Sequence, residues 1–383
     1  MSRKVKEGVA VTETAVEESQ SKDKKVSLHS LISKLQKDFP STIRDVKVSG
    51  QVKRLVLSSP QLNYIMGGGY PIGRIIQLYG PESSGKSTLT TYIASEIQKQ
   101  PTKNIVVYMD FERSFEESHA LEIGLDTSPE KFIFLRPENG EEGFTVLEEL
   151  VKSNQVGLVI VDSDATVPTR NQIADDYGKA GFGPQSKLFA DALRKFNPIL
   201  EKYETSMIWI SQERDNIGVM YGPDTKPTGG SAIKFYASQR YRVTRIDYIK
   251  EAGEIVGIFM KVRNIKNKAG IPFREAEMKL YYKGGFDTES EYLDYIVKFE
   301  FVKQKGAYYQ SEEYGFSLQG KERLLSYLNE HLDIYKTLKD RVNAYMLKRN
   351  EQDIENLAKV SKKVDIEGEL IEDPESIPEI LEG

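Results

Sequence analysis

Between about residues 50 and 286, short apolar runs alternate with segments in which apolar residues recur every three or four positions. Runs such as 158–161 are apolar at every position, which is typical of strands buried on both faces of a parallel sheet. The pattern predicts an α/β fold, with a mostly parallel sheet flanked by helices and closed by an antiparallel edge. The expected strands are 75–79, 105–109, 132–135, 158–161, 207–210, 240–246, 255–264 and 277–282.

The N-terminal pattern is different. Residues 1–26 are rich in Glu, Lys, Ser and Thr without a helical period, which predicts a disordered arm. In residues 27–49, apolar positions such as Leu28 and Leu31 repeat at three- and four-residue spacing until Pro40. This spacing predicts an amphipathic helix followed by a linker, and the apolar face of that helix needs a partner.

After residue 286 the chain becomes rich in Tyr, Lys and Glu, and helical spacing returns at Leu324, Leu328 and Leu332. Residues 287–364 are therefore expected to form a small C-terminal α+β domain beside the core at 50–286. Residues 365–383 contain acidic side chains and no basic one, which predicts a disordered acidic tail.

Composition narrows the chemistry. The 383 residues include no cysteine and only three histidines, which excludes disulfides, thiolate metal sites and cysteine nucleophiles. No apolar run is long enough to span a membrane and no secretory signal begins the chain, so we expect no membrane partner and a cytoplasmic location. The net charge of −5 implies that any DNA binding depends on a local basic surface.

The strongest motif lies between the first expected strand and a helix. Its glycines allow successive backbone N–H groups to point inward, and the helix that follows favours an anion at its N-terminus. This is a phosphate-binding P-loop, in which Lys86 would reach the β- and γ-phosphates and the Ser87 hydroxyl would hold Mg²⁺. The predicted nucleotide-binding residues here are Gly80, Pro81, Glu82, Ser83, Ser84, Gly85, Lys86, Ser87 and Thr88.

Two further strand ends are acidic. Asp162 follows the apolar run 158–161, where P-loop NTPases anchor Mg²⁺ through water. Glu112 follows the strand at 105–109, where a carboxylate can orient and deprotonate the water that attacks the γ-phosphate. The sequence therefore predicts ATP and Mg²⁺ as cofactors, with Ser87 and Asp162 as the metal-binding pair.

Taken together, these motifs resemble bacterial RecA-type DNA recombinases, including forms encoded by bacteriophages. The resemblance covers most of the chain, from about residue 28 to 345, and implies a RecA-type P-loop NTPase core. It also implies that the helix at 27–39 packs on a neighbouring protomer. The matching segments, in family order, are 80–87, 110–112, 162–163, 217–222, 228–230, 234–238 and 266–268.

The resemblance assigns roles to matched residues. Glu112 would be the catalytic glutamate, and Gln212 would sense the γ-phosphate and couple it to the DNA-binding loop that follows. Lys266 and Lys268 would reach the phosphate bound by an adjacent protomer and stabilise charge in the transition state, as an arginine finger does. On the base side the matched residues are Glu116, His119 and Tyr282, where His119 replaces a tyrosine and Glu116 an aspartate.

Two glycine-bearing loops, at about 175–185 and 213–227, match the DNA-binding loops of the family. Single-strand binding needs cations and backbone N–H groups for phosphates, and apolar side chains that lie between bases. Acidic residues in or beside the loops, including Glu213, would oppose phosphate. The predicted DNA-binding residues are Lys179, Phe182, Gly183, Lys187, Arg194, Arg214, Asn216, Ile217, Gly218, Met220, Thr228, Gly229, Gly230 and Ser231.

The function implied is that of a DNA-dependent ATPase that forms homo-oligomeric helical filaments on single-stranded DNA, pairs them with duplex DNA and exchanges strands. A single-strand binding protein or a loader is a further partner that this function suggests, in a bacterial cell or a phage-infected host. Two alternatives stay open at this point. One is a hexameric replicative helicase motor, which shares the core, and the other is a regulatory ATPase that does not recombine DNA.

Overall fold

The computed structural model describes residues 28–39, 52–174, 183–215 and 225–367. The chain divides into two compact units, Met1–Gln51 and Val52–Gly383. In the first unit, α1 (Leu28–Asp38) is the predicted amphipathic helix, and none of its residues is buried. The arm expected at 1–26 and most of the linker expected before residue 50 lie outside the described residues.

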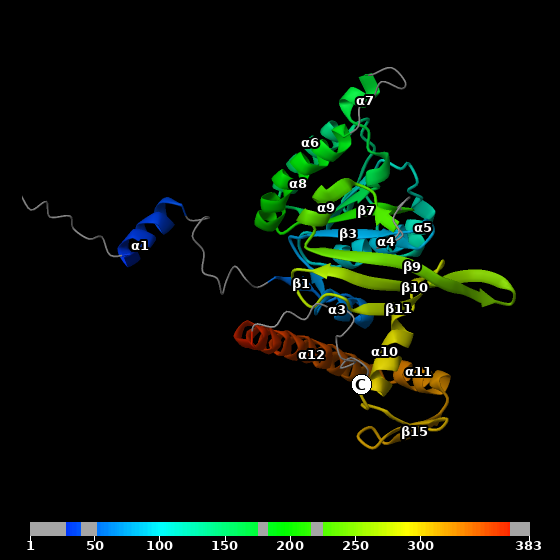
Figure 1. Cartoon of the computed structure of the whole chain (residues 1–383). Helices are drawn as coiled ribbons and strands as arrows, with labels where there is room; N and C mark the ends of the chain where they lie inside the picture. Colours follow the sequence, from blue (N-terminus) through cyan, green and yellow to red (C-terminus); the bar gives the residue numbers. More distant parts are fainter. Residues whose placement is uncertain (1–27, 40–51, 175–182, 216–224, 368–383) are drawn as a thin grey trace, which may run out of the picture. The chain divides into compact units, whose positions relative to one another are not determined.

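The second unit is built on one large sheet, with strand order β12-β11-β10-β9-β3-β7-β6-β4-β5, and β8 paired to β7 (Figure 1). Every strand predicted from the apolar runs is present, which confirms the α/β fold class. The strands are β3 (Ile75–Gly80), β4 (Ile105–Asp110), β5 (Phe132–Leu135), β6 (Val156–Asp162), β7 (Ser206–Asp215), β8 (Thr225–Pro227), β9 (Gln239–Glu251), β10 (Glu254–Asn267), β11 (Glu275–Tyr281) and β12 (Gly285–Phe286). A separate two-stranded sheet pairs β1 (Arg54–Leu55) with β2 (Tyr70–Pro71).

Strands β3, β7, β6, β4 and β5 run parallel and form what we call the parallel half of the sheet. Every residue of β3 and β6 is buried, because helices cover both faces. Alternate residues enter two cores: Ile76 packs with α3 (Pro60–Met66) and α4 (Lys86–Gln98), whereas Ile75 packs on the opposite face. That second face is covered by α6 (Gly140–Lys152), α8 (Pro184–Tyr203) and α9 (Gly230–Tyr236).

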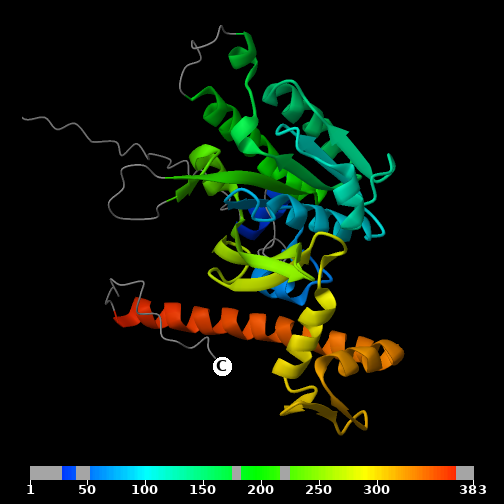
Figure 2. The ribbon, with the colours of Figure 1, turned by 90° about the vertical axis from the view of Figure 1, so that its right-hand side faces the viewer.

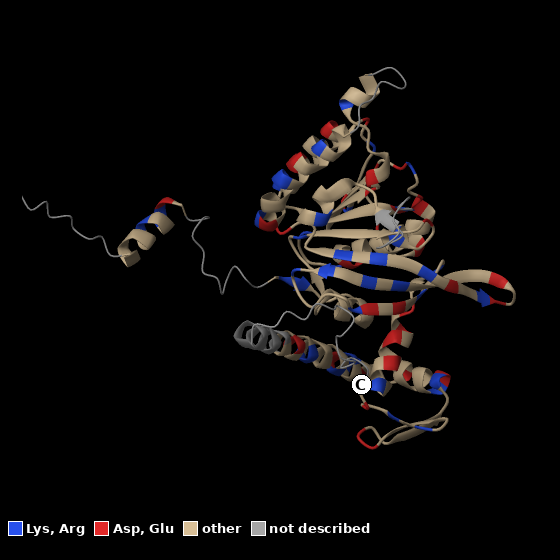
Figure 3. Cartoon of the chain, in the orientation of Figure 1, with Lys and Arg blue, Asp and Glu red and all other residues tan. Residues whose placement is uncertain are grey.

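Strands β9 to β12 form the antiparallel half, which joins the parallel half where β9 pairs with β3. Here burial alternates along each strand: Tyr241 of β9 and Val262 of β10 are in the first core, while the residues next to them in each strand are more exposed. The outward face is charged, and Lys261 bridges Glu275 and Glu277 at 3.2 and 3.0 Å. Figure 3 shows Lys and Arg recurring along β9 and β10.

The C-terminal region has its own hydrophobic cluster, which includes Leu293, Leu324 and Leu338, and is α+β as predicted. Arg274 of the core donates to Asp353 of the last helix at 2.5 Å, so that helix is joined to the sheet. The helix runs three residues past the expected boundary at 364, and residues 368–383 of the predicted tail lie outside the described part (Figure 2). The elements are α10 (Thr288–Lys298), β13 (Lys303–Lys305), β14 (Tyr308–Ser311), β15 (Phe316–Gln319), α11 (Lys321–Glu330) and α12 (Leu332–Glu367).

The remaining helices of the described residues are short: α5 (Glu117–Glu122), the 3₁₀ turn η1 (Asp164–Thr166) and α7 (Arg170–Ala174). Among the described residues, the structure contains no helix with the length and apolarity needed to cross a membrane.

Candidate nucleotide-binding site

The P-loop joins β3 to α4, as the sequence predicts. Gly85 begins the helix with a φ of +90°, a left-handed conformation that side chains rarely adopt. Gly80 lies so close to β9 that a Cβ there would be 2.0 Å from the Val243 carbonyl oxygen. The two glycines therefore let the loop turn sharply against the sheet, and the N-terminus of α4 faces the carboxyl ends of the strands.

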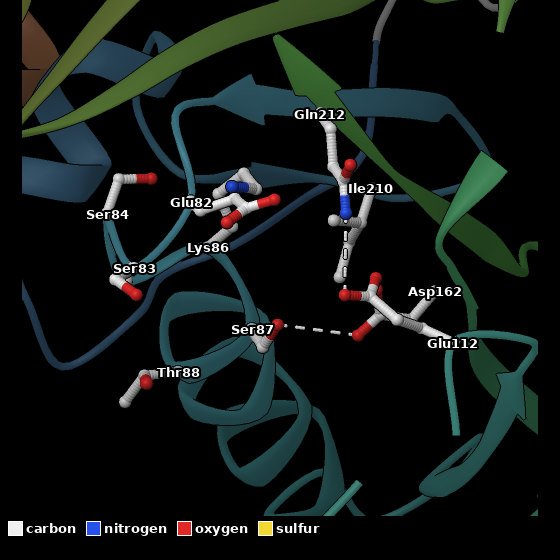
Figure 4. A pocket seen from close by; sticks show the side chains of 11 residues that line it. Glu82, Ser83, Ser84, Lys86, Ser87, Thr88, Glu112, Asp162, Ile210 and Gln212 are labelled. Carbon is white, nitrogen blue, oxygen red and sulfur yellow. Dashed lines mark hydrogen bonds between the residues drawn. The ribbon is translucent and has the colours of Figure 1, made fainter. Parts of the chain in front are cut away.

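A cleft of about 320 Å³ opens at these strand ends (Figure 4). The loop and α4 form one side, and β6, β7 and the segment after β4 contribute the opposite side. Residues far apart in sequence therefore line one cleft. The lining residues are Glu82, Ser83, Ser84, Gly85, Lys86, Ser87, Thr88, Glu112, Asp162, Ile210 and Gln212.

Lys86 is buried and donates to the carbonyl oxygens of Gly80 and Pro81, at 3.1 and 2.6 Å. Burial lowers the pKa of the Lys86 ammonium from its ordinary value, while the nearby Asp162 and Glu112 carboxylates oppose that shift. The ammonium is therefore held within the loop, in a cleft where its charge is only partly compensated. This is an environment that favours an incoming phosphate anion.

Asp162 ends β6 and is almost fully buried. Burial raises the pKa of Asp162 to about 6, helped by the Glu112 and Asp110 charges and opposed by hydrogen bonds from Tyr108 and Ser87. The Ser87 hydroxyl donates to the carboxylate at 3.4 Å. A hydroxyl and a carboxylate oxygen side by side are ligands that suit Mg²⁺, so Ser87 and Asp162 fit the predicted metal-binding role.

Glu112 is exposed to the cleft, and its position is fixed by its backbone. The N–H groups of Phe111 and Glu112 both donate to the Asp162 carbonyl, at 2.7 and 3.2 Å. The Gln212 side chain donates to the Glu112 carboxylate at 3.4 Å, so the two side chains meet on the side of the cleft opposite the P-loop (Figure 4). Gln212 is joined through its backbone to Thr228, with the Gln212 N–H 3.1 Å from the Thr228 hydroxyl.

The residues predicted to contact the base do not line this cleft. The ring Nε2 of His119 lies 3.2 Å from the Thr88 hydroxyl, which brings α5 against the first turn of α4. Glu116 stands at the start of α5, and Tyr282 is an exposed residue just after β11. His119 therefore lies next to the loop, and the base-contacting roles of His119, Glu116 and Tyr282 all stay predictions.

Lys266 and Lys268 also lie apart from the cleft of their own chain. Lys266 donates to the carbonyl oxygens of Lys234 and Phe235 at the end of α9, at 2.6 and 3.1 Å. Burial lowers the pKa of Lys266 to about 8, and the charges of Lys268 and Arg240 add to the shift. Lys268 lies over the exposed Phe235 ring at 5.6 Å.

Of the predicted DNA-binding residues, eight lie in described segments. Gly230, at the start of α9, is against Ser186, at the start of α8, so the ends of both predicted loops meet. Arg214 is exposed, whereas Glu213 pairs with Arg242 through two contacts of 2.9 and 3.2 Å, which neutralises the acid expected to oppose DNA. Described are Gly183, Lys187, Arg194, Arg214, Thr228, Gly229, Gly230 and Ser231; Lys179, Phe182, Asn216, Ile217, Gly218 and Met220 lie outside the described residues.

Sequence reasoning missed several residues around the cleft. The Tyr108 hydroxyl donates to Asp162, and Arg136 holds the buried Asp110 at 3.1 Å. Asp164, two residues beyond Asp162, is fully buried, and burial raises its pKa to about 6 against hydrogen bonds from Ser211 and Thr228. The sequence held one signal for Asp164: a second carboxylate only two residues beyond Asp162, at the end of the apolar run.

A parallel sheet whose strand ends gather a glycine loop, its lysine, a buried aspartate and an exposed glutamate defines a P-loop nucleoside triphosphatase. The family model described as "RecA N-terminal domain" matches residues 27–287. Protein RecA of Lactobacillus acidophilus is 35% identical over 89% of this chain and 94% of its own length. Protein RecA of Mycoplasma mycoides is 39% identical over 68% of this chain and 74% of its own length.

The chain therefore belongs to the RecA family. Members of this family are DNA-dependent ATPases that act as recombinases, which confirms the predicted function class and does not favour the helicase alternative. Membership implies nucleotide binding, DNA binding and filament formation.

Proposed function

We propose that this chain hydrolyses ATP with Mg²⁺ while assembled as a helical filament on single-stranded DNA, and uses the filament to pair and exchange strands with duplex DNA. One observation carries the proposal: Lys86, Ser87, Glu112, Asp162 and Gln212 line a single cleft. In that cleft, the Gln212 side chain contacts Glu112, and the Gln212 backbone is bonded to Thr228, which flanks the second predicted DNA loop.

The residues have distinct tasks in hydrolysis. Lys86 turns from the loop carbonyls to the β- and γ-phosphates, where its charge offsets the charge that develops in the transition state. Ser87 and Asp162 would hold Mg²⁺, which would supply further charge neutralisation at the phosphates. Glu112 accepts a proton from the attacking water, and its fixed backbone keeps the carboxylate at the cleft.

Coupling to DNA follows from the second contact of Gln212. When the γ-phosphate competes for the Gln212 amide, the bond to Glu112 changes, and Thr228, directly after β8, responds. Lys266 and Lys268 act on the cleft of an adjacent protomer, which is supported by their distance from the cleft of their own chain. Full activity therefore requires assembly, in which α1 packs on the neighbour.

The test is electron microscopy of the chain with single-stranded DNA and a slowly hydrolysed ATP analogue, combined with a strand-exchange assay. We expect helical filaments and exchanged product; closed rings, or neither filaments nor exchange, would contradict the proposal.

A matched pair of variants tests the cleft in the same assay. Lys86→Ala should lower DNA-stimulated hydrolysis on the order of 10²- to 10³-fold, because one charge-stabilising donor is removed. Lys99→Ala, at the other end of α4, should hydrolyse ATP as the unaltered chain does. Equal rates in the two variants would show that the loop does not serve hydrolysis.

A further inference from the structure

A buried carboxylate stands between the nucleotide cleft and both predicted DNA loops. Asp164 lies in η1, directly after the strand that ends in Asp162, and is fully buried. Its two oxygens accept hydrogen bonds from two hydroxyls: Ser211 on one oxygen and Thr228 on the other. These hydroxyls lie on either side of the segment expected to form the second DNA loop, so one carboxylate fastens both ends of that loop.

The same residue reaches the first predicted loop through its backbone. The Gln185 side chain, at the start of α8, donates to the Asp164 carbonyl at 2.8 Å and to the Val167 carbonyl at 2.9 Å. Gly229 is fitted closely to the carboxylate, since a Cβ at this position would lie 2.2 Å from an Asp164 oxygen. The ends of the two loops are therefore packed on one acid.

Further hydrogen bonds join both hydroxyls to the nucleotide cleft and to the sheet. Ser211 precedes Gln212 in β7 and accepts from the Gln77 amide at 2.7 Å, and Gln77 in turn accepts from Arg240 of β9 at 2.7 Å. Thr228 accepts from the Gln212 N–H at 3.1 Å. Asp164 is thus bonded both to Ser211, which precedes Gln212, and to Thr228, which accepts from the Gln212 N–H. Through Ser211 and Gln77 the same network reaches β9, the strand that pairs with β10.

We propose that Asp164 is a positioning residue that couples the nucleotide cleft to both DNA loops. It holds Ser211 and Thr228 on one acceptor, so a displacement of Gln212 moves the two loop flanks together. This inference rests on the proposed function of the cleft. It adds a residue that touches neither nucleotide nor DNA and acts only through those that do.

A carboxylate suits this task better than a neutral residue. A carboxylate offers one acceptor oxygen to each hydroxyl, so both hydroxyls are held in a single geometry in a buried site. Coupling between two sites corresponds to a ratio of affinities, commonly about 5- to 150-fold. Loss of the shared acceptor should therefore reduce that ratio, whereas loss of simple packing would weaken binding in every state alike.

The experiment measures the affinity of a labelled single-stranded oligonucleotide at one salt concentration, once with a slowly hydrolysed ATP analogue and once with ADP. The ratio of the two dissociation constants reports the coupling. In Asp164→Ala we expect the ratio to fall at least about fivefold. Nucleotide affinity without DNA should stay within about twofold of the unaltered chain, because the cleft residues remain in place.

Two variants separate positioning from packing. Asp164→Asn keeps one acceptor oxygen and puts an NH₂ donor in the place of the other, so its ratio should lie between that of Asp164→Ala and that of the unaltered chain. Ser211→Ala removes one of the two hydroxyls and should lower the ratio about threefold. If circular dichroism shows that Asp164→Ala is unfolded, the ratio in Ser211→Ala tests the positioning role in its place. Asp126→Ala, a substitution in an exposed loop, is the control and should leave the ratio unchanged.

The outcomes are distinct. An unchanged ratio in folded Asp164→Ala, or an equal loss of affinity with ATP analogue and with ADP, would overturn the positioning role while leaving the proposed function intact. A ratio of one in the unaltered chain would instead overturn the nucleotide-DNA coupling on which the proposed function depends.

Discussion

The two halves of the central sheet are stabilised differently and offer different surfaces. In the parallel half, β3 and β6 are buried at every position and helices cover both faces. In the antiparallel half, β9 and β11 bury alternate residues, and the other face presents charges such as Arg263 and Glu277. A strand covered on both faces leaves only its ends accessible, whereas a half-covered sheet leaves a whole face accessible.

This difference separates the tasks. The parallel half brings its chemistry together at strand ends, where Glu112 and Asp162 meet the P-loop. The antiparallel half carries Lys266 at the end of β10 and a charged face, both suited to contact with another macromolecule. Hydrolysis should therefore depend on the first half within one chain, and on the second half only in assemblies.

The largest expected effect lies in the parallel half. Glu112→Gln should lower DNA-stimulated ATP hydrolysis on the order of 10²- to 10⁴-fold, because a general base is lost, while nucleotide and DNA binding persist. Steady-state hydrolysis together with equilibrium binding of a fluorescent nucleotide checks this. The control is Glu122→Gln at the end of α5. If Glu112→Gln instead binds nucleotide more weakly but hydrolyses the nucleotide it binds as fast as the unaltered chain does, Glu112 has a structural role.

A buried carboxylate outside the parallel half should make the free energy of unfolding depend on pH. Glu291 of α10 accepts from Ser59 at 2.6 Å, and burial raises its pKa from 4.5 to about 7. Between those pH values the folded chain keeps a proton that the unfolded chain has released. The free energy of unfolding therefore falls as pH rises from about 4.5 to about 7, by on the order of 3 kcal/mol from this group.

The measurement is denaturant unfolding at pH 5 and pH 8 for Glu291→Gln and for the unaltered chain. The amide cannot ionise, so the variant should gain stability relative to the unaltered chain as pH rises. Glu322→Gln, an exposed position in α11, should follow the unaltered chain at both pH values. A stability difference that does not depend on pH would show that Glu291 does not retain a proton.

A mixing experiment tests whether the antiparallel half acts on a neighbour. Protein with both Lys266→Ala and Lys268→Ala keeps its own glutamate, and Glu112→Gln keeps both lysines. Mixed filaments contain interfaces at which each variant supplies what the other lacks, so hydrolysis should recover about tenfold over either variant alone. Absence of recovery at every mixing ratio, with mixed filaments demonstrated, would argue against a role in trans.

The smallest expected effect concerns the acidic tail. Removing residues 368–383 should strengthen duplex DNA binding by a factor of about 3 to 10 at low salt, because a tethered anion competes with phosphates for the basic C-terminal residues. These basic residues include Lys303 and Lys305 of β13, together with Lys339 and Arg341, which pair with Glu289 and Glu313.

Duplex affinity across a salt series measures the tail effect, which should shrink as salt screens the charges. A full-length control with the tail acids changed to amides should behave like the shortened chain. Unchanged duplex affinity at low salt would assign the tail another role.

Much of the fold could be predicted because its signals are local. The apolar runs located every strand of the large sheet from β3 to β11 except the short β8, and the glycine loop needed only eight consecutive residues to define its chemistry. The C-terminal boundary was less exact, since α12 continues to Glu367 although its composition becomes acidic from Asp365. Helix propensity and cooperativity carried the helix beyond the point at which composition suggested an end.

By itself, the sequence determined the order of strands and helices, the P-loop and the acids at two strand ends, because backbone geometry and periodicity act over a few residues. Only the tertiary structure joined Asp164 to Thr228, 64 residues later, paired Glu213 with Arg242, 29 residues away, and bound Arg274 to Asp353, 79 residues away. These contacts depend on which side chains packing brings together. A buried charge needs a partner, but its local sequence does not specify which one.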